Sequence, residues 1–100
     1  MPACKKISFN VPEKDVLRIG KIETFLKSCL STGIVQCVTR GKGEILEITR
    51  RGRKKQSIAH YEVSVVGGEE EAEKFISSLF ERGFIPNGKI WQVLRLPDFY

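Results

Sequence analysis

The sequence predicts an α+β fold, a four-stranded antiparallel sheet with both helices on one face. Three observations lead to this prediction. Four segments of the 100-residue chain have strand-like patterns and two have helical patterns. Each helical pattern separates two strand patterns, which gives two βαβ halves of similar length. With 41% apolar and 29% charged residues, a chain of this size is expected to form one domain over residues 1–100.

The first half contains a strand, a helix and a second strand. The strand over residues 5–11 has three apolar residues at the two-residue period of a half-buried strand: Ile7, Phe9 and Val11. Asp15 is a suitable N-cap for the helix that follows, and Gly33 a suitable C-terminal residue. The inner face of the helix is predicted from apolar residues spaced three and four apart: Ile19, Ile22, Phe25, Leu26, Cys29 and Leu30. The second strand is expected over residues 34–40, with Cys37 as a small buried hydrophobe inside it.

The second half begins at the third strand, over residues 57–66. Residues 44–49 also have strand-like composition, so the connection between strands two and three is expected to be a long loop or a hairpin. The second helix follows residue 68, and its inner face is predicted to contain Ala72, Phe75, Ile76, Leu79 and Phe80. A final strand is expected over residues 89–96. The resulting order, βαββαβ, is typical of the ferredoxin-like fold.

Net charge is concentrated in one short segment, residues 50–55. The chain has 17 Lys and Arg residues against 12 Asp and Glu residues, and five of these cations lie in that segment: Arg50, Arg51, Arg53, Lys54 and Lys55. The remaining 12 cations balance the 12 anions, so the net charge of +5 belongs to this segment. We therefore expect the segment to bind an anionic partner.

The residue types argue against an enzyme and against a metal site. The one histidine, His60, falls in a predicted strand without a cysteine or serine beside it, and no pair of carboxylates is expected at a cleft. The three cysteines show no Cys-x-x-Cys spacing, which argues against zinc and against a disulfide framework. Because no apolar run is long enough to be a signal peptide or a membrane span, we expect a cytoplasmic protein without a transmembrane segment.

Two glycine-lysine sequences are candidates for binding a phosphate-bearing ligand. Glycine leaves backbone N–H groups open to close approach, and lysine adds a mobile positive charge. The candidate ligand-binding residues are Arg40, Gly41, Lys42, Gly43, Gly88 and Lys89. In the predicted sheet they belong to opposite edge strands, so only an assembly of subunits would bring them together. The alternative is that each sequence merely forms a turn.

The layout from Ile7 to Leu96 resembles the PII signalling protein superfamily. Val38-Thr39-Arg40-Gly41-Lys42-Gly43 is similar to the glycine-rich start of that family's T-loop, and Gly88-Lys89-Ile90 to the entry into its last regular strand. The resemblance implies a homotrimer with an adenine nucleotide as the candidate ligand in the cleft between subunits. Lys89 and the backbones of Gly41 and Gly88 would then contact phosphate, with Arg40 and Lys42 as second choices. Residues 44–57 would be the T-loop that engages a partner protein.

These observations leave two main functional hypotheses. The first is a PII-like small-molecule sensor that regulates a partner protein through the basic T-loop. The second is a nucleic-acid-binding protein whose residues 50–55 contact phosphates. Base stacking on the sheet is not expected, because Phe9 and Tyr61 fall on apolar, core-facing sides of their strands. Docking to an acidic protein or an anionic lipid surface, or a solvated loop without a partner, are the remaining alternatives.

Overall fold

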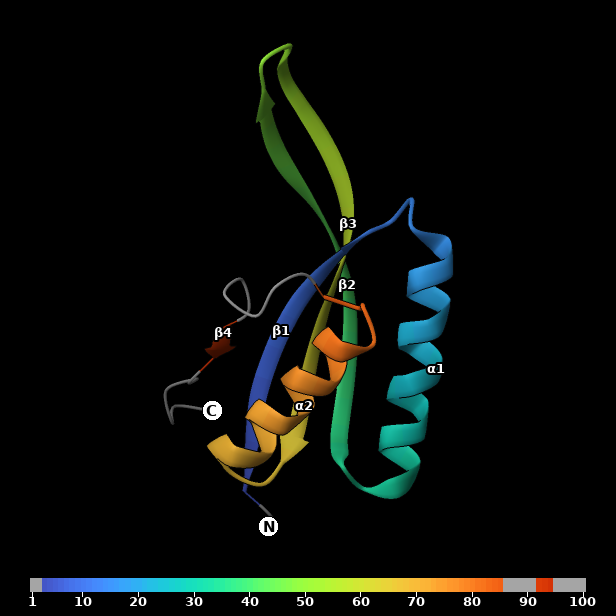
Figure 1. The fold of residues 1–100 in the computed structure, drawn as a ribbon, viewed down its shortest axis with the longest axis vertical. Coiled ribbons are helices and arrows are strands. Elements are labelled where there is room, and N and C mark those ends of the chain that lie inside the picture. The colour runs from blue at the N-terminus through green and yellow to red at the C-terminus, as the bar shows by residue number, and fades with distance from the viewer. Residues whose placement is uncertain (1–2, 86–91, 95–100) are drawn as a thin grey trace.

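The structure, a computed structural model, describes residues 3–85 and 92–94. Within these residues the elements follow the order β1, α1, β2, β3, α2, β4 (Figure 1). Their bounds are Cys4–Pro12 for β1, Val16–Thr32 for α1, Val35–Thr49 for β2, Gly52–Val66 for β3, Glu69–Glu81 for α2 and Gln92–Leu94 for β4. The chain is therefore an α+β protein with two helices on an antiparallel sheet.

Three long strands carry the sheet, in the order β2-β3-β1. Among the described residues, the three of β4 pair with the outer edge of β1, opposite Lys6–Ser8. The prediction of a ferredoxin-like sheet with four regular strands is therefore wrong, and the parts of the expected strand at 89–91 and 95–96 lie outside the described residues. An apolar run in the sequence predicts extended backbone. Whether that backbone forms a strand depends on a neighbouring strand that pairs with its N–H and C=O groups, and the spacing of apolar residues does not show which strand that is.

Helix α1 begins and ends where the sequence places its caps. The carboxylate of Asp15 accepts a hydrogen bond from the backbone N–H of Arg18 at the start of α1. Gly33 ends α1 in the left-handed conformation, with φ 81°, which only glycine adopts readily. Both predicted caps are confirmed. At the start of α2, the side chain of Glu71 accepts a 2.7 Å hydrogen bond from the backbone N–H of Gly68, a contact not predicted from the sequence.

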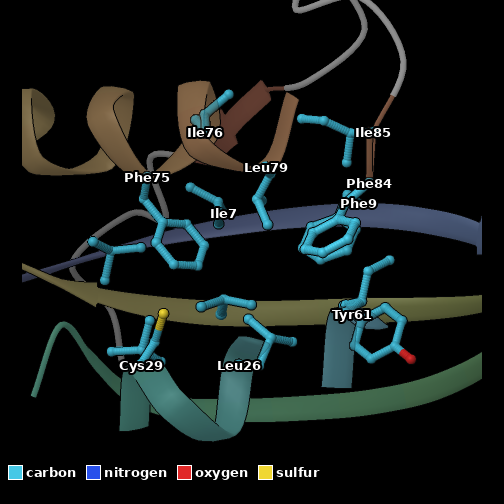
Figure 2. Close-up of a cluster of buried hydrophobic side chains, with 14 of the residues drawn as sticks. Ile7, Phe9, Leu26, Cys29, Tyr61, Phe75, Ile76, Leu79, Phe84 and Ile85 are labelled. Carbon is cyan, nitrogen blue, oxygen red and sulfur yellow. The ribbon is translucent and has the colours of Figure 1, made fainter. Parts of the chain in front are cut away.

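The core lies between the two helices and one face of the sheet (Figure 2). The sheet supplies alternate residues of its strands to this face: Ile7, Phe9, Val11, Ala59, Tyr61, Val63 and Val65. The helices supply Ile19, Ile22, Leu26, Cys29, Ala72, Phe75, Ile76 and Leu79. Phe9 and Tyr61 are buried in this core, as the sequence predicts, and their rings stack with centroids 5.2 Å apart. Phe80, expected on the inner face of α2, is instead exposed.

The opposite face of the sheet is polar. His60 on β3 lies within hydrogen-bond distance of Asn10 on β1, with 2.6 Å between Nδ1 and Oδ1, and its Nε2 is 3.7 Å from a carboxylate oxygen of Glu62. Cys37 of β2 is exposed, so the prediction that it is buried is wrong. Cys37 lies in a strand, as predicted. It is exposed because its side chain lies on the face of the sheet that the helices do not cover, and its residue type does not indicate that face.

Strands β2 and β3 continue well past the helices as a two-stranded hairpin, which Figure 1 shows projecting from the body of the molecule. The last residue of β1, Pro12, pairs with Ile58, so no third strand among residues 3–85 and 92–94 pairs with residues 44–57. We call residues 44–57 the arm. Of the two forms predicted for this connection, the hairpin is the one observed, and β2 runs through Gly41-Lys42-Gly43 without a break.

Candidate functional site

The tip of the arm is a tight turn with two basic residues. Thr49 pairs with Gly52, and Arg50 and Arg51 form the turn between them. Gly52 has φ 120°, and among the described residues only glycines have positive φ. Glycine at position 52 therefore allows the chain to reverse immediately after the two arginines. Both arginines are exposed at the far end of the hairpin.

The cations that follow the turn lie on both faces of the arm. Successive side chains of a strand point to opposite faces, so Arg53 and Lys55 share one face and Lys54 lies on the other. All three side chains are exposed. With Arg50 and Arg51 at the end, cations lie on two faces of the arm and at its tip, although Lys54 is paired across the strands with Glu47. A partner is therefore most favourably placed when it surrounds the arm with negative charge.

Exposed apolar side chains accompany the cations. Leu46 pairs with Lys55 and Ile48 with Arg53 across the arm, so the four residues share the face that, further along the same strands, packs against the helices. The side chain of Leu46 is 51% exposed and that of Ile48 is 76% exposed. We call Leu46 and Ile48 the apolar row. Sequence reasoning missed it because the pattern is also that of a buried strand.

Ion pairs between described side chains lie in the body of the molecule: Arg18 with Asp15, Arg40 with Glu23, His60 with Glu62, and Lys74 with Glu70. None of these pairs uses Arg53, Lys54 or Lys55. Among the described side chains, the positive charge of this part of the arm is therefore not neutralised by an ion pair. The side chain of Glu47, which is paired across the strands with Lys54, is not among those described.

Arg40, one of the predicted ligand-binding residues, is held by the body. Its guanidinium lies 2.6 Å from a carboxylate oxygen of Glu23 on α1, and the same oxygen accepts a 3.1 Å hydrogen bond from the hydroxyl of Tyr61. Burial, together with the hydrogen bond and charge of Glu23, raises the pKa of Tyr61 to about 12, and the charge of Arg40 partly opposes this shift. Arg40 thus already has a partner in the structure.

The other predicted ligand-binding residues do not form a loop. Gly41, Lys42 and Gly43 are paired within β2, opposite residues 60, 59 and 58 of β3. Gly88 and Lys89 lie outside the described residues. The structure therefore brings together the predicted partner-binding cations of the arm, whereas the predicted phosphate site remains a prediction.

A groove of about 900 Å³ lies beside α1 and the end of α2. Its lining residues include Leu17, Gly20, Phe25 and Phe84, with Lys21 and Arg82 among the polar ones. The guanidinium of Arg82 lies over the ring of Phe25, 4.3 Å from its centroid. The polar residues that line the described part of the groove are Lys21, Thr24, Ser28 and Arg82.

No described helix has the length and apolar character needed to span a membrane. Among the described residues there is also no group of three or more His, Cys, Asp or Glu side chains placed to hold a metal ion. No family model matches this chain, and no curated protein matches it.

Proposed function

We propose that the protein binds double-stranded DNA by placing the arm in the major groove, where its cations contact phosphates. The observation that carries this proposal is the distribution of Arg50, Arg51, Arg53, Lys54 and Lys55 on both faces and at the end of a projecting hairpin. A flat anionic surface would contact only one face of such an arm. A groove has a phosphate backbone on each side, and it can neutralise cations on both faces.

The dimensions of the arm support this choice. Paired strands lie about 4.8 Å apart, and the major groove of B-form DNA, about 12 Å wide, admits a two-stranded ribbon. The major groove of A-form RNA is too narrow and deep for side chains to read, so DNA is favoured over duplex RNA. Stacking of single-stranded bases is not supported on the described sheet, because Phe9 and Tyr61 are buried in the core.

The PII-like sensor hypothesis remains a second prediction from sequence. In the structure, Arg40 is paired with Glu23, and residues 41–43 are part of a strand rather than a glycine-rich loop. Nothing in the described residues adds to this hypothesis, so the arm is the stronger basis for a function.

The test is duplex binding measured by fluorescence anisotropy across salt concentrations from about 50 to 200 mM. If all five cations contact phosphates, log K should fall with log salt concentration at a slope of about −4.5. The triple variant Arg53→Gln, Lys54→Gln, Lys55→Gln should bind at least about tenfold more weakly at low salt. Its slope should be smaller in magnitude by about 2.7.

The matched control removes the same number of charges from the body. Lys21, Lys27 and Lys74 are exposed on the two helices, away from the arm. The triple variant Lys21→Gln, Lys27→Gln, Lys74→Gln should keep the salt slope of the original protein. Equal losses in the two triple variants would show attraction by net charge alone and would contradict the proposal. Tighter binding to an RNA duplex or to anionic vesicles than to DNA would also contradict it.

A further inference from the structure

We infer that the apolar row faces the base pairs and contacts thymine methyl groups in the major groove. This inference rests on the proposed function and extends it from phosphate contact to base contact. The row consists of Leu46 and Ile48, which share one face of the arm with Arg53 and Lys55. The chemical class of ligand is a B-form duplex that contains thymine.

The exposure of the row is the first step. Ile48 is 76% exposed near the tip of the arm, and Leu46 is 51% exposed two residues earlier. Phosphate contacts alone give these side chains no role, because phosphate oxygens offer no apolar surface. The C5-methyl group of thymine is the apolar feature that base pairs present in the major groove. Burial of methyl surface against Leu46 and Ile48 would add to the affinity that the cations supply.

The two faces of the arm differ in a way that orients it. One face has the apolar row on β2 and the pair Arg53 and Lys55 on β3. On the other face, Ile45 is 40% exposed and pairs with Gln56, which is half-buried. The first face presents more exposed apolar surface beside cations. It is therefore the face we place toward the base edges, with Arg53 and Lys55 beside the row and Lys54 on the outward face of the arm.

The spacing of the row matches that of base pairs. Residues two apart in an antiparallel strand are separated by about 6.8 Å, and base pairs along one DNA strand by about 3.4 Å. An arm that follows the groove would therefore bring Leu46 and Ile48 over bases about two steps apart. Duplexes with thymines at this spacing are expected to bind most tightly.

The experiment compares a short labelled duplex containing such thymines with the same duplex in which uracil replaces each thymine. This replacement removes only the methyl groups. The original protein should bind the uracil duplex more weakly, by about fourfold for each contacted methyl group. Ile48→Ala should weaken binding to the thymine duplex and reduce the difference between the two duplexes.

Two control variants separate base contact from phosphate contact. Ile45→Ala removes an apolar side chain from the opposite face and should leave the ratio of the two affinities unchanged. Lys54→Gln should weaken binding to both duplexes while keeping the ratio, because it removes a charge from the face opposite the row.

Equal affinity for the two duplexes would overturn the inference but leave the proposed function standing. Absence of binding to any duplex would overturn both. A thymine preference that is unchanged in Ile48→Ala would place the methyl contact elsewhere and also overturn the inference. So would a sedimentation shift from dimer to monomer in Ile48→Ala without DNA, because a second copy of the chain would then cover the row.

Discussion

The body and the arm are built from the same two strands, yet their side chains are arranged in opposite ways. On the helix-facing side of β3, the body half is apolar and buried, from Ala59 to Val65, and the arm half is basic and exposed at Arg53 and Lys55. On the same side of β2 the change is less sharp. Val35 and Val38 lie in or against the core, Arg40 and Lys42 follow, and the arm half carries the exposed apolar row.

The difference shows that an apolar strand residue on the helix-facing side is buried only where a helix packs over it. The two-residue pattern of the strand does not bury it by itself. Helix α1 has 17 residues and spans about 26 Å at 1.5 Å per residue. Strand β3 has 15 residues and spans about 50 Å at 3.4 Å per residue. A helix of this length covers only about half of the strand beside it. An apolar residue beyond that limit stays exposed, however regular its spacing.

The largest effect expected from this comparison is a difference between two identical substitutions. Ile22 on α1 is fully buried, whereas Ile48 on the arm is 76% exposed. Ile22→Ala should lower the free energy of unfolding by about 2 to 5 kcal/mol, because it removes transfer free energy and leaves a cavity. Ile48→Ala should change it by less than about 0.5 kcal/mol. Urea unfolding of the two variants measures both values.

Alanine at position 22 is also compatible with a helix, so the loss in Ile22→Ala would not reflect helix propensity. A loss above about 1.5 kcal/mol in Ile48→Ala would mean that something covers the apolar row in the free protein. The comparison of body and arm would then be wrong, and the inference of base contact with it.

Local patterns predicted the helices and the core well. The caps at Asp15 and Gly33 are short-range features, fixed by residues within one turn, and the structure confirms them. The core faces of β1 and β3 follow from the two-residue period. Phe80 shows where periodicity fails, because a side chain can lie on the edge of an apolar stripe and remain outside the packed interface.

Features that depend on contacts between distant parts of the chain were harder to predict from the sequence. The extent of β4 depends on pairing with β1, and the exposure of Cys37 depends on which face the helices cover. The link between Glu23, Arg40 and Tyr61 joins positions up to 38 residues apart, and no spacing rule indicates it. The position of the basic residues on a projecting arm was anticipated, but their distribution over both faces required the register of the hairpin.

Two glycines with positive φ allow a second comparison of body and arm. A Cβ atom added at either position would meet open space, so the cost of a substitution would come from backbone strain alone. Gly33, with φ 81°, ends α1 in the body, and Gly52, with φ 120°, follows the turn of the arm. Gly33→Ala should destabilise the protein by about 1 to 2 kcal/mol. Gly52→Ala should change global stability by less than about 0.5 kcal/mol, because the arm can open locally and relieve the strain.

Urea unfolding measures the global effect of both glycine variants, and amide hydrogen exchange measures the local one. Faster exchange confined to residues 44–57 is expected in Gly52→Ala, with no change in the core strands. Global destabilisation of equal size in the two variants would indicate that the arm unfolds together with the body. The separation drawn between the two regions would then be wrong.

A smaller effect is expected from the hydroxyl of Tyr61, which lies in the core of the body. Tyr61→Phe removes the hydrogen bond to Glu23 and should lower the free energy of unfolding by about 0.5 to 1.5 kcal/mol at neutral pH. The pKa of this tyrosine is raised from 10.0 to about 12, so the folded state holds the proton more tightly than the unfolded state. This contribution is fully present below pH 10 and is lost as the pH rises toward 12.

The alkaline dependence is measured by urea unfolding of both proteins over this range. The part of the alkaline loss of stability that comes from the Tyr61 hydroxyl should be absent in Tyr61→Phe. All other ionisable groups are the same in the two proteins. The difference in unfolding free energy between the two should therefore shrink as the pH increases. A difference that stays constant would show that the hydroxyl is not held in its protonated form by the fold.

The smallest effect is expected from the ion pair of Arg40 with Glu23, which joins β2 to α1 within the body. The two side chains are 41% and 39% exposed, so water and salt screen their attraction. A double-mutant cycle with Arg40→Ala and Glu23→Gln should give a coupling energy below about 1 kcal/mol at low salt, and it should vanish near 1 M salt, where the screening length is about 3 Å. A coupling above about 2 kcal/mol that persists in salt would contradict this expectation, because it would mean that solvent does not screen the pair. Because the pair lies outside the arm, Arg40→Ala should also weaken DNA binding less than the loss of an arm cation does.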